Sequence, residues 1–235
     1  MKIKKLISAL VLGSMLVGLS GCNITDFSAE NLLRPPKAVG DEAEIEQLIA
    51  KTADSGYTLK YPKNGKFRSA IIMTDLDGND SNEAVAFFRN SAETSSVHML
   101  VMYSKDNSWK IASDNIFETT DIDSVDFADL TGNGKAEIIV NSTTYTPNVG
   151  KLSCYSYSEG KTNEVGSGQS CSSFVTGDFD NDGTSEIMSL VLYTTENEAL
   201  ASMLDYNEDS KSLYAKAMAN MDPNVVKYKN IAVTK

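Results

Sequence analysis

The sequence predicts an all-β repeat protein with one helix near its N-terminus. From residue 57 onward, short apolar runs rich in β-branched and aromatic residues alternate with polar turns, a pattern typical of antiparallel strands. An acidic segment of nine residues also recurs three times in one register, beginning at Asp75, Asp129 and Asp178. These starts lie about 50 residues apart, a spacing typical of repeat architectures.

The predicted helix covers residues 41–56. Acidic residues crowd its first turn, where they interact favourably with the helix dipole. Ile45, Leu48, Ile49 and Thr52 recur at helical spacing and therefore share one face. We expect this face to pack against the repeat domain as a cap.

The predicted strands define the repeat unit. Each acidic segment lies between two apolar runs, and hairpin turns are predicted at 106–108 and 158–160. The clearest runs are 69–73, 84–88, 98–103, 136–140 and 187–193, whereas 212–221 suits either a helix or a strand. A unit of about 50 residues with four strands has the period of a propeller blade. Residues 57–235 are therefore predicted to form a β-propeller-like array of about three to four blades. The array is either small or incomplete, or it is the front part of a longer protein.

The three acidic segments are candidate cation sites, and we name them loop 1 (residues 75–83), loop 2 (129–137) and loop 3 (178–186). Each opens with Asp, closes with Glu, and carries oxygen-bearing side chains at alternate positions between, except at Lys135 of loop 2. Ca²⁺ takes six to eight oxygen ligands from a tightly curled chain. The alternative is a set of polar turns held by side-chain hydrogen bonds without metal. Carboxylates packed together repel unless a cation is present, which favours structural calcium.

Loop 3 is the most complete candidate site. Thr184 and Ser81 would contribute backbone carbonyls, and Asp80 stands in loop 1 where glycine is expected. Loop 2 is weaker because Thr131 and Asn133 occupy carboxylate positions. No loop has Glu at its twelfth position, and strands rather than helices flank each one, so these are not EF-hands. The candidate ligands are Asp178, Asp180, Asp182, Thr184 and Glu186 in loop 3; Asp75, Asp77, Asn79, Ser81 and Glu83 in loop 1; and Asp129, Asn133 and Glu137 in loop 2.

The loops resemble the calcium loops of FG-GAP repeats, which form integrin-α-like and VCBS-type propeller blades. The resemblance covers roughly residues 68–195, and the best match is the segment 178–183 together with Glu186. It implies a β-propeller whose inter-strand loops bind Ca²⁺ for rigidity. Loop 2 departs from the family pattern because it has lost two charges.

The N-terminus predicts export and lipid attachment. A basic start precedes an apolar run over 6–19, as in a signal peptide, and the run ends in Leu19-Ser20-Gly21-Cys22. This ending looks like a bacterial lipobox, in which cleavage after residue 21 leaves Cys22 to carry acyl chains such as palmitate. The alternative is an ordinary secretory signal with a chance cysteine. We expect a signal peptide over 1–21, a tether over 22–40, and a protein anchored by lipid to the extracytoplasmic face of the cell membrane.

Composition narrows the function classes. The chain has 32 acidic and 21 basic residues and a formal net charge of −11, which argues against nucleic-acid binding. It has one histidine, His98, within an apolar run, and it lacks a nucleophile elbow, a phosphate loop and zinc-ligand spacing. We therefore expect that the protein is not an enzyme. We expect a calcium-stabilised binding or scaffold module with a protein or glycan ligand. The alternatives are a subunit of an envelope assembly, and a carbohydrate-active enzyme or an accessory fragment of one.

Cys154 and Cys171 flank the turn predicted at 158–160. An exported chain permits a disulfide, and a hairpin would place the two strands side by side. We expect a disulfide; the alternative is a pair of buried free thiols.

Overall fold

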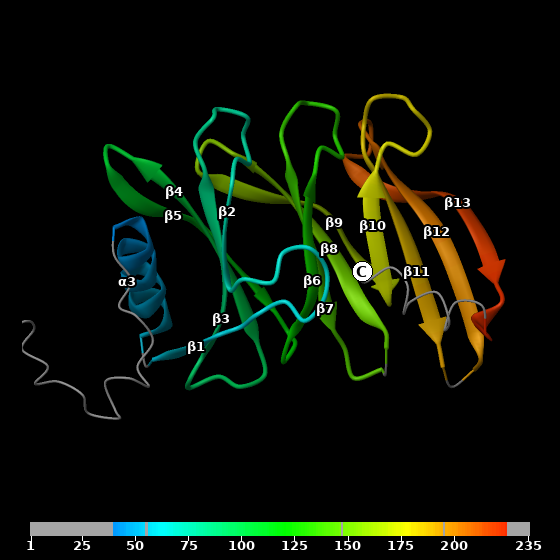
Figure 1. The fold of residues 1–235 in the computed structure, drawn as a ribbon, viewed down its shortest axis with the longest axis horizontal. Coiled ribbons are helices and arrows are strands. Elements are labelled where there is room, and N and C mark those ends of the chain that lie inside the picture. Colours follow the sequence, from blue (N-terminus) through cyan, green and yellow to red (C-terminus); the bar gives the residue numbers. More distant parts are fainter. Residues whose placement is uncertain (1–39, 55, 147, 195, 225–235) are drawn as a thin grey trace, which may run out of the picture. The chain divides into compact units, whose positions relative to one another are not determined.

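A computed structural model of the protein describes residues 40–54, 56–146, 148–194 and 196–224. One helix, α3 (Asp41–Ala53), precedes a succession of strands (Figure 1). The strands are β1 (Tyr57–Leu59), β2 (Ile71–Thr74), β3 (Glu83–Asn90), β4 (Val97–Lys105), β5 (Ser108–Phe117), β6 (Ile122–Ala128), β7 (Glu137–Thr143), β8 (Gly150–Ser158), β9 (Lys161–Cys171), β10 (Ser173–Gly177), β11 (Glu186–Tyr193), β12 (Glu198–Asn207) and β13 (Ser212–Met221). The predicted all-β fold with an N-terminal helix is confirmed for these residues.

The strands form three antiparallel sheets in chain order. In sheet A, β1 and β2 both pair with β3, and β4 and β5 follow. Sheet B has the order β6-β7-β8-β9, and sheet C has the order β10-β11-β12-β13. The ambiguous stretch 212–221 is therefore a strand, paired with β12. Sheets B and C, and β2 to β5 of sheet A, are meanders in which neighbours in sequence are neighbours in space.

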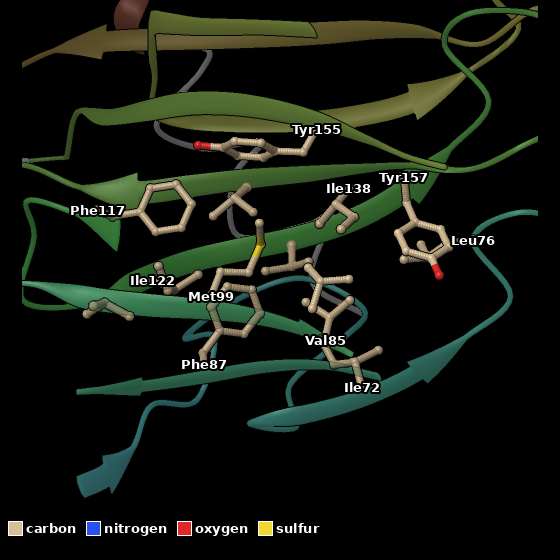
Figure 2. Close-up of a cluster of buried hydrophobic side chains, with 14 residues drawn as sticks. Ile72, Leu76, Val85, Phe87, Met99, Phe117, Ile122, Ile138, Tyr155 and Tyr157 are labelled. Atoms are coloured by element: carbon tan, nitrogen blue, oxygen red, sulfur yellow. The ribbon is translucent and has the colours of Figure 1, made fainter. Parts of the chain in front are cut away.

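Sheets A and B pack face to face. Phe87 and Met99 of sheet A meet Ile122 and Ile138 of sheet B in one buried cluster (Figure 2). A second cluster joins sheet B to sheet C through residues such as Ile139 and Ile187. A central strand covered on both faces reads as a continuous apolar run rather than an alternating one, as β3 does.

The helix covers the other face of sheet A. Ile45, Ile49 and Ala53 are buried against a cluster that includes Phe88 and Leu100. This contact confirms the predicted cap. The helix ends at Ala53 rather than at 56, because Asp54 takes a φ of 56° and leaves the helical conformation.

Both predicted hairpin turns are present. Asp106 and Asn107 join β4 to β5 with φ values of 55° and 57°, and Glu159 and Gly160 join β8 to β9 with 52° and 74°. Two successive positive φ values suit the right-handed twist of the flanking strands.

The expected disulfide is wrong: Cys154 and Cys171 are free and buried. The hairpin brings their strands together, but Cys154 lies opposite Gly166 and Cys171 lies opposite Gly150. Four positions along a strand correspond to about 13 Å. A disulfide requires Cα atoms within about 7 Å. Burial raises the pKa of the Cys171 thiol to about 12 and raises that of Cys154 as well, so both behave as small apolar side chains.

The predicted signal peptide, Cys22 and nearly all of the tether lie outside the described residues. Among the residues described, no helix has the length and apolar character needed to cross a membrane.

Candidate metal centres

The three acidic loops occupy equivalent places in the three sheets. Loop 1 joins β2 to β3, loop 2 joins β6 to β7, and loop 3 joins β10 to β11, so each links the first two neighbouring strands of its meander. Figure 1 shows all three at the same end of the sheets. The positions predicted from the sequence repeat are therefore equivalent in space.

Neighbouring loops are hydrogen-bonded to each other. The Ala136 amide of loop 2 donates to the Leu76 carbonyl of loop 1 at 3.1 Å, and the Ser185 amide of loop 3 donates to the Asp129 carbonyl of loop 2 at 2.9 Å. A Cβ added at Gly132 would lie 2.7 Å from a methyl carbon of Thr184, so loops 2 and 3 are in close contact there. A change that stiffens one loop therefore also restrains the loop beside it.

The loops share one backbone geometry. The second residue of each donates its amide to the closing glutamate, and the opening aspartate accepts amides from the fifth and sixth residues. The distance is 2.8 Å for each of the pairs Leu76–Glu83, Leu130–Glu137 and Phe179–Glu186. The sixth residue has positive φ in every loop: 64° at Asp80, 79° at Gly134 and 96° at Gly183. Asp80 thus adopts the conformation for which glycine was expected.

Loop 3 gathers four carboxylates. Oxygens of Asp178, Asp180, Asp182 and Glu186 all lie within 4.8 Å of one another. Glu186 is fully buried, and its Oε1 has no hydrogen-bond partner within the described part of the chain. A buried, unpartnered carboxylate oxygen is costly, and a cation bound among these oxygens would satisfy it.

Thr184 supports one of these carboxylates. Its hydroxyl and its amide donate to Asp182 Oδ1 at 2.5 and 2.8 Å, which holds the pKa of Asp182 below its usual value. Asp182 is therefore kept in the charged form that a metal ligand needs.

Loop 1 gathers three carboxylates. Oxygens of Asp75, Asp77 and Glu83 lie within 4.8 Å of one another, and Asp77 Oδ1 is buried with no partner among the described residues. Burial, together with the neighbouring charges of Asp77 and Asp75, raises the pKa of Glu83 to about 7. The Asn79 Oδ1 accepts the Ser81 amide at 2.8 Å, so these two predicted ligands are hydrogen-bonded to each other.

Loop 2 satisfies its own glutamate. The Thr131 hydroxyl donates to Glu137 Oε1 at 3.3 Å, the oxygen equivalent to the unpartnered Oε1 of Glu186. Asn133 Oδ1 accepts the Lys135 amide at 2.9 Å. Within the described residues, loop 2 forms no group of three or more acidic, cysteine or histidine side chains positioned to hold a metal ion. Of the three loops, loop 2 has the least need of a cation.

The sequence analysis missed a cation next to loop 3. The Lys216 ammonium, from the edge strand β13, lies 2.5 Å from Asp180 Oδ2 and 2.9 Å from Asp205 Oδ2. Hydrogen bonds to these two carboxylates raise the pKa of Lys216 above its ordinary value. Nothing in the local sequence of β13 signals this contact, because it depends on how the whole of sheet C is ordered.

His98 has a structural setting. Its Nδ1 lies 2.9 Å from Asp114 Oδ1, and its ring stacks on Phe88 with the centroids 4.8 Å apart. The side chain is buried, and Nε2 has no partner among the described residues. No loop carboxylate is among these contacts.

A comparison with protein-family models and a comparison with curated proteins found no match to this chain.

Proposed function

We propose that this protein is a calcium-clamped binding or scaffold module, tethered by lipid on Cys22 to the extracytoplasmic face of a bacterial membrane. The observation that carries the proposal is the pairing of converging carboxylates with a buried, unpartnered oxygen in loops 1 and 3. Loop 2 has the same backbone geometry but lacks this feature, so the turn forms without converging carboxylates.

The oxygen-only donor set fits a hard cation such as Ca²⁺. Loop 3 would hold it with Asp178, Asp180, Asp182 and Glu186, and loop 1 with Asp75, Asp77 and Glu83. Asn79 and the backbone carbonyls of Thr184 and Ser81 are the further proposed ligands. When bound, the ion neutralises carboxylates that otherwise repel one another.

The sheet arrangement supports a propeller-type architecture of the FG-GAP kind. Successive antiparallel meanders pack face to face, and each carries its acidic loop between equivalent strands. In such an array the ions stiffen the junctions between sheets, and the remaining surface is free to bind a partner. That partner is a protein or a glycan.

The stabilisation expected from calcium is moderate. A site with a dissociation constant of roughly 10⁻⁴ M contributes about 1.4 kcal/mol at about 1 mM free ion. Two such sites give about 3 kcal/mol, against a total of roughly 5–15 kcal/mol for a typical domain. Calcium therefore stiffens a fold that its apolar cores already form.

Thermal unfolding with calcium or with a chelator tests the clamp. We expect 1 mM Ca²⁺ to raise the melting temperature of the wild type, and Asp178→Ala to lose about half of that shift. Asp209→Ala removes an exposed carboxylate from the β12–β13 turn and serves as the matched control. Equal calcium shifts in the wild type and in Asp178→Ala would refute the clamp.

Cell fractionation tests the anchor. The wild type is expected in the membrane fraction, and Cys22→Ser is expected to leave it. Persistence in the membrane fraction of a Cys22→Ser chain whose signal peptide has been removed would argue against lipid attachment at this residue.

A further inference from the structure

An open cavity lies between sheets B and C at the end opposite the acidic loops. Strand β6 runs from Ile122 to Ala128, where loop 2 follows, and the cavity lies at its start, beside Asp123. Its volume is about 760 Å³, within the range of roughly 300–1,000 Å³ that small-molecule sites occupy. The walls come from the segment before β2, from β6 to β8, and from the Ser172 and Leu192 side of sheet C.

The walls of this cavity carry mainly hydroxyl and amide groups. Thr120, Thr146, Asn148, Ser172 and Thr194 line it, with Leu192 and Val149 as buried apolar contacts. Small-molecule sites are usually lined by apolar side chains. Hydroxyls and amides both donate and accept, so this lining matches a ligand that also does both.

The charges at the cavity do not select an ionic ligand. Lys63 and Asp123 are the charged residues that line it within the described chain, and they bear opposite signs. The Lys63 ammonium is already paired with Asp121 at 3.0 Å. A phosphate or a strongly charged peptide would therefore meet no free counter-charge here.

Asp123 is held in place by its neighbours. Asn64 Nδ2 donates to its Oδ1 at 2.8 Å, and Ser124 Oγ and Asn141 Nδ2 donate to its Oδ2 at 3.1 and 3.4 Å. The Asn64 amide also donates to the Asp123 carbonyl at 2.7 Å. Asn141 is only 1% exposed, and its Oδ1 has no partner among the described residues. The wall therefore contains a fixed cluster of carboxylate and amide groups whose hydrogen-bonding capacity is not fully used.

An exposed tyrosine lies on a connection that lines this cavity. Tyr145 is 95% exposed and stands between the cavity-lining residues Thr144 and Thr146. Hydrogen bonds from the Thr144 hydroxyl to the Val149 carbonyl at 2.5 Å and from the Val149 amide to the Thr146 carbonyl at 3.2 Å tie this connection together. An exposed aromatic ring on such a connection can offer a flat apolar face to a ligand whose edges are polar.

From this combination we infer that the cavity is a binding site for a neutral saccharide. Sugar hydroxyls would exchange hydrogen bonds with Asp123, Asn64 and the threonine-rich wall, and the apolar face of a sugar ring would stack on Tyr145. The inference rests on the proposed role as a binding module, but it uses none of the calcium ligands.

Saturation-transfer NMR on the mature chain in 1 mM Ca²⁺ tests this assignment. The probes are glucose, galactose, mannose, fucose and N-acetylglucosamine, each at millimolar concentration. We expect transfer to at least one sugar, and about tenfold weaker binding in Tyr145→Ala and in Asn64→Ala. Tyr214→Ala, an exposed tyrosine on β13, is the control and is expected to bind as the wild type does.

Two results would overturn the assignment: no transfer to any of the five sugars, or equal affinities in the wild type, Tyr145→Ala and Asn64→Ala. Because Tyr145 lies on the surface, its replacement leaves the fold intact, and an unchanged melting temperature checks this. Calcium-dependent melting of Tyr145→Ala separates this site from the clamp. If Tyr145→Ala keeps the normal calcium shift in melting temperature but loses sugar binding, both the sugar site and the calcium clamp are supported. If the protein binds sugar but shows no calcium shift, only the clamp is refuted.

Discussion

Loops 2 and 3 share one backbone geometry, but they differ in how the closing glutamate is satisfied. In both, the closing glutamate accepts the second amide at 2.8 Å and the opening aspartate accepts the fifth and sixth amides. In loop 2, Thr131 donates to Glu137 Oε1, whereas in loop 3 Asp180 stands at that position and Glu186 Oε1 stays unpartnered. The Thr131 hydroxyl thus satisfies the glutamate oxygen in loop 2, as a cation would satisfy it in loop 3.

The comparison separates the shape of the turn from its charge. Backbone amides donating to Asp and Glu form the turn in all three loops, so carboxylates at the third and fifth positions are not needed for the fold. These carboxylates instead decide whether the turn depends on an ion. Exchanging the side chains at the third and fifth positions should therefore convert one kind of loop into the other.

The largest expected effect is the conversion of loop 2. The double variant Thr131→Asp with Asn133→Asp removes the hydroxyl donor and adds two carboxylates, so we expect it to create a third calcium site. Without calcium the variant should be less stable than the wild type because the new charges repel. With 1 mM Ca²⁺ it should recover about 1.4 kcal/mol, measured by urea unfolding.

The reverse variant, Asp180→Thr with Asp182→Asn, is the matched control. It is expected to make loop 3 resemble loop 2 and to remove one calcium site while the turn persists. If the double variant in loop 2 neither bound calcium nor lost stability in chelator, the role assigned to these positions would be wrong.

A second effect is expected from pH, through the glutamate of loop 1. Glu83 has a pKa of about 7 when folded, against an ordinary value of 4.5, so the folded state holds this proton more tightly than the unfolded state does. When a chelator keeps calcium away, the stability contributed by protonated Glu83 is present below about pH 4.5 and is lost as pH rises through 7. Urea unfolding between pH 5 and 8 should therefore show a decline that Glu83→Gln removes.

Calcium should flatten the same decline, because the bound ion stabilises the deprotonated carboxylate. Burial also raises the pKa of Glu137, but the Thr131 hydroxyl favours its charged form, so Glu137→Gln should change the pH dependence less. An identical slope in the wild type and in Glu83→Gln would show that other groups govern it.

The smallest effect is expected at Lys216. Its ammonium holds Asp180, and a calcium ion entering loop 3 must compete with it. Because Lys216 lies at the surface and water screens it, we expect Lys216→Met to tighten calcium binding at loop 3 by only about twofold to fivefold. Calorimetric titration measures this change, and Lys211→Met, on the same β12–β13 hairpin, is the control. Weaker binding in Lys216→Met would show that the ammonium orients Asp180 for the ion instead.

Much of the fold follows from local sequence. Apolar runs predicted the strands, and Asp106, Asn107 and Gly160 are residue types that such turns favour. The face built on Ile45 and Ile49 predicted the contact of the helix with sheet A. The regular spacing of oxygen-bearing residues located all three acidic loops, because position within a tight turn is itself a local property.

Features that depend on register were not predictable. Irregularities in the β8–β9 pairing, between Leu152 and Ser153 and between Cys154 and Tyr155, shift which residues face each other, so the exact partners of the two cysteines could not be derived from sequence. The contact of Lys216 with Asp180 spans 36 residues and depends on every strand of sheet C. The Asp123 cluster likewise needs Asn64 from a segment that precedes β2.

Calcium stoichiometry tests the central claim most directly. Isothermal titration of chelator-treated protein is predicted to give two sites per chain, with one lost in Asp178→Ala and the other lost in Asp75→Ala. No binding, or two sites that both survive these substitutions, would contradict the assignment of the clamp to loops 1 and 3.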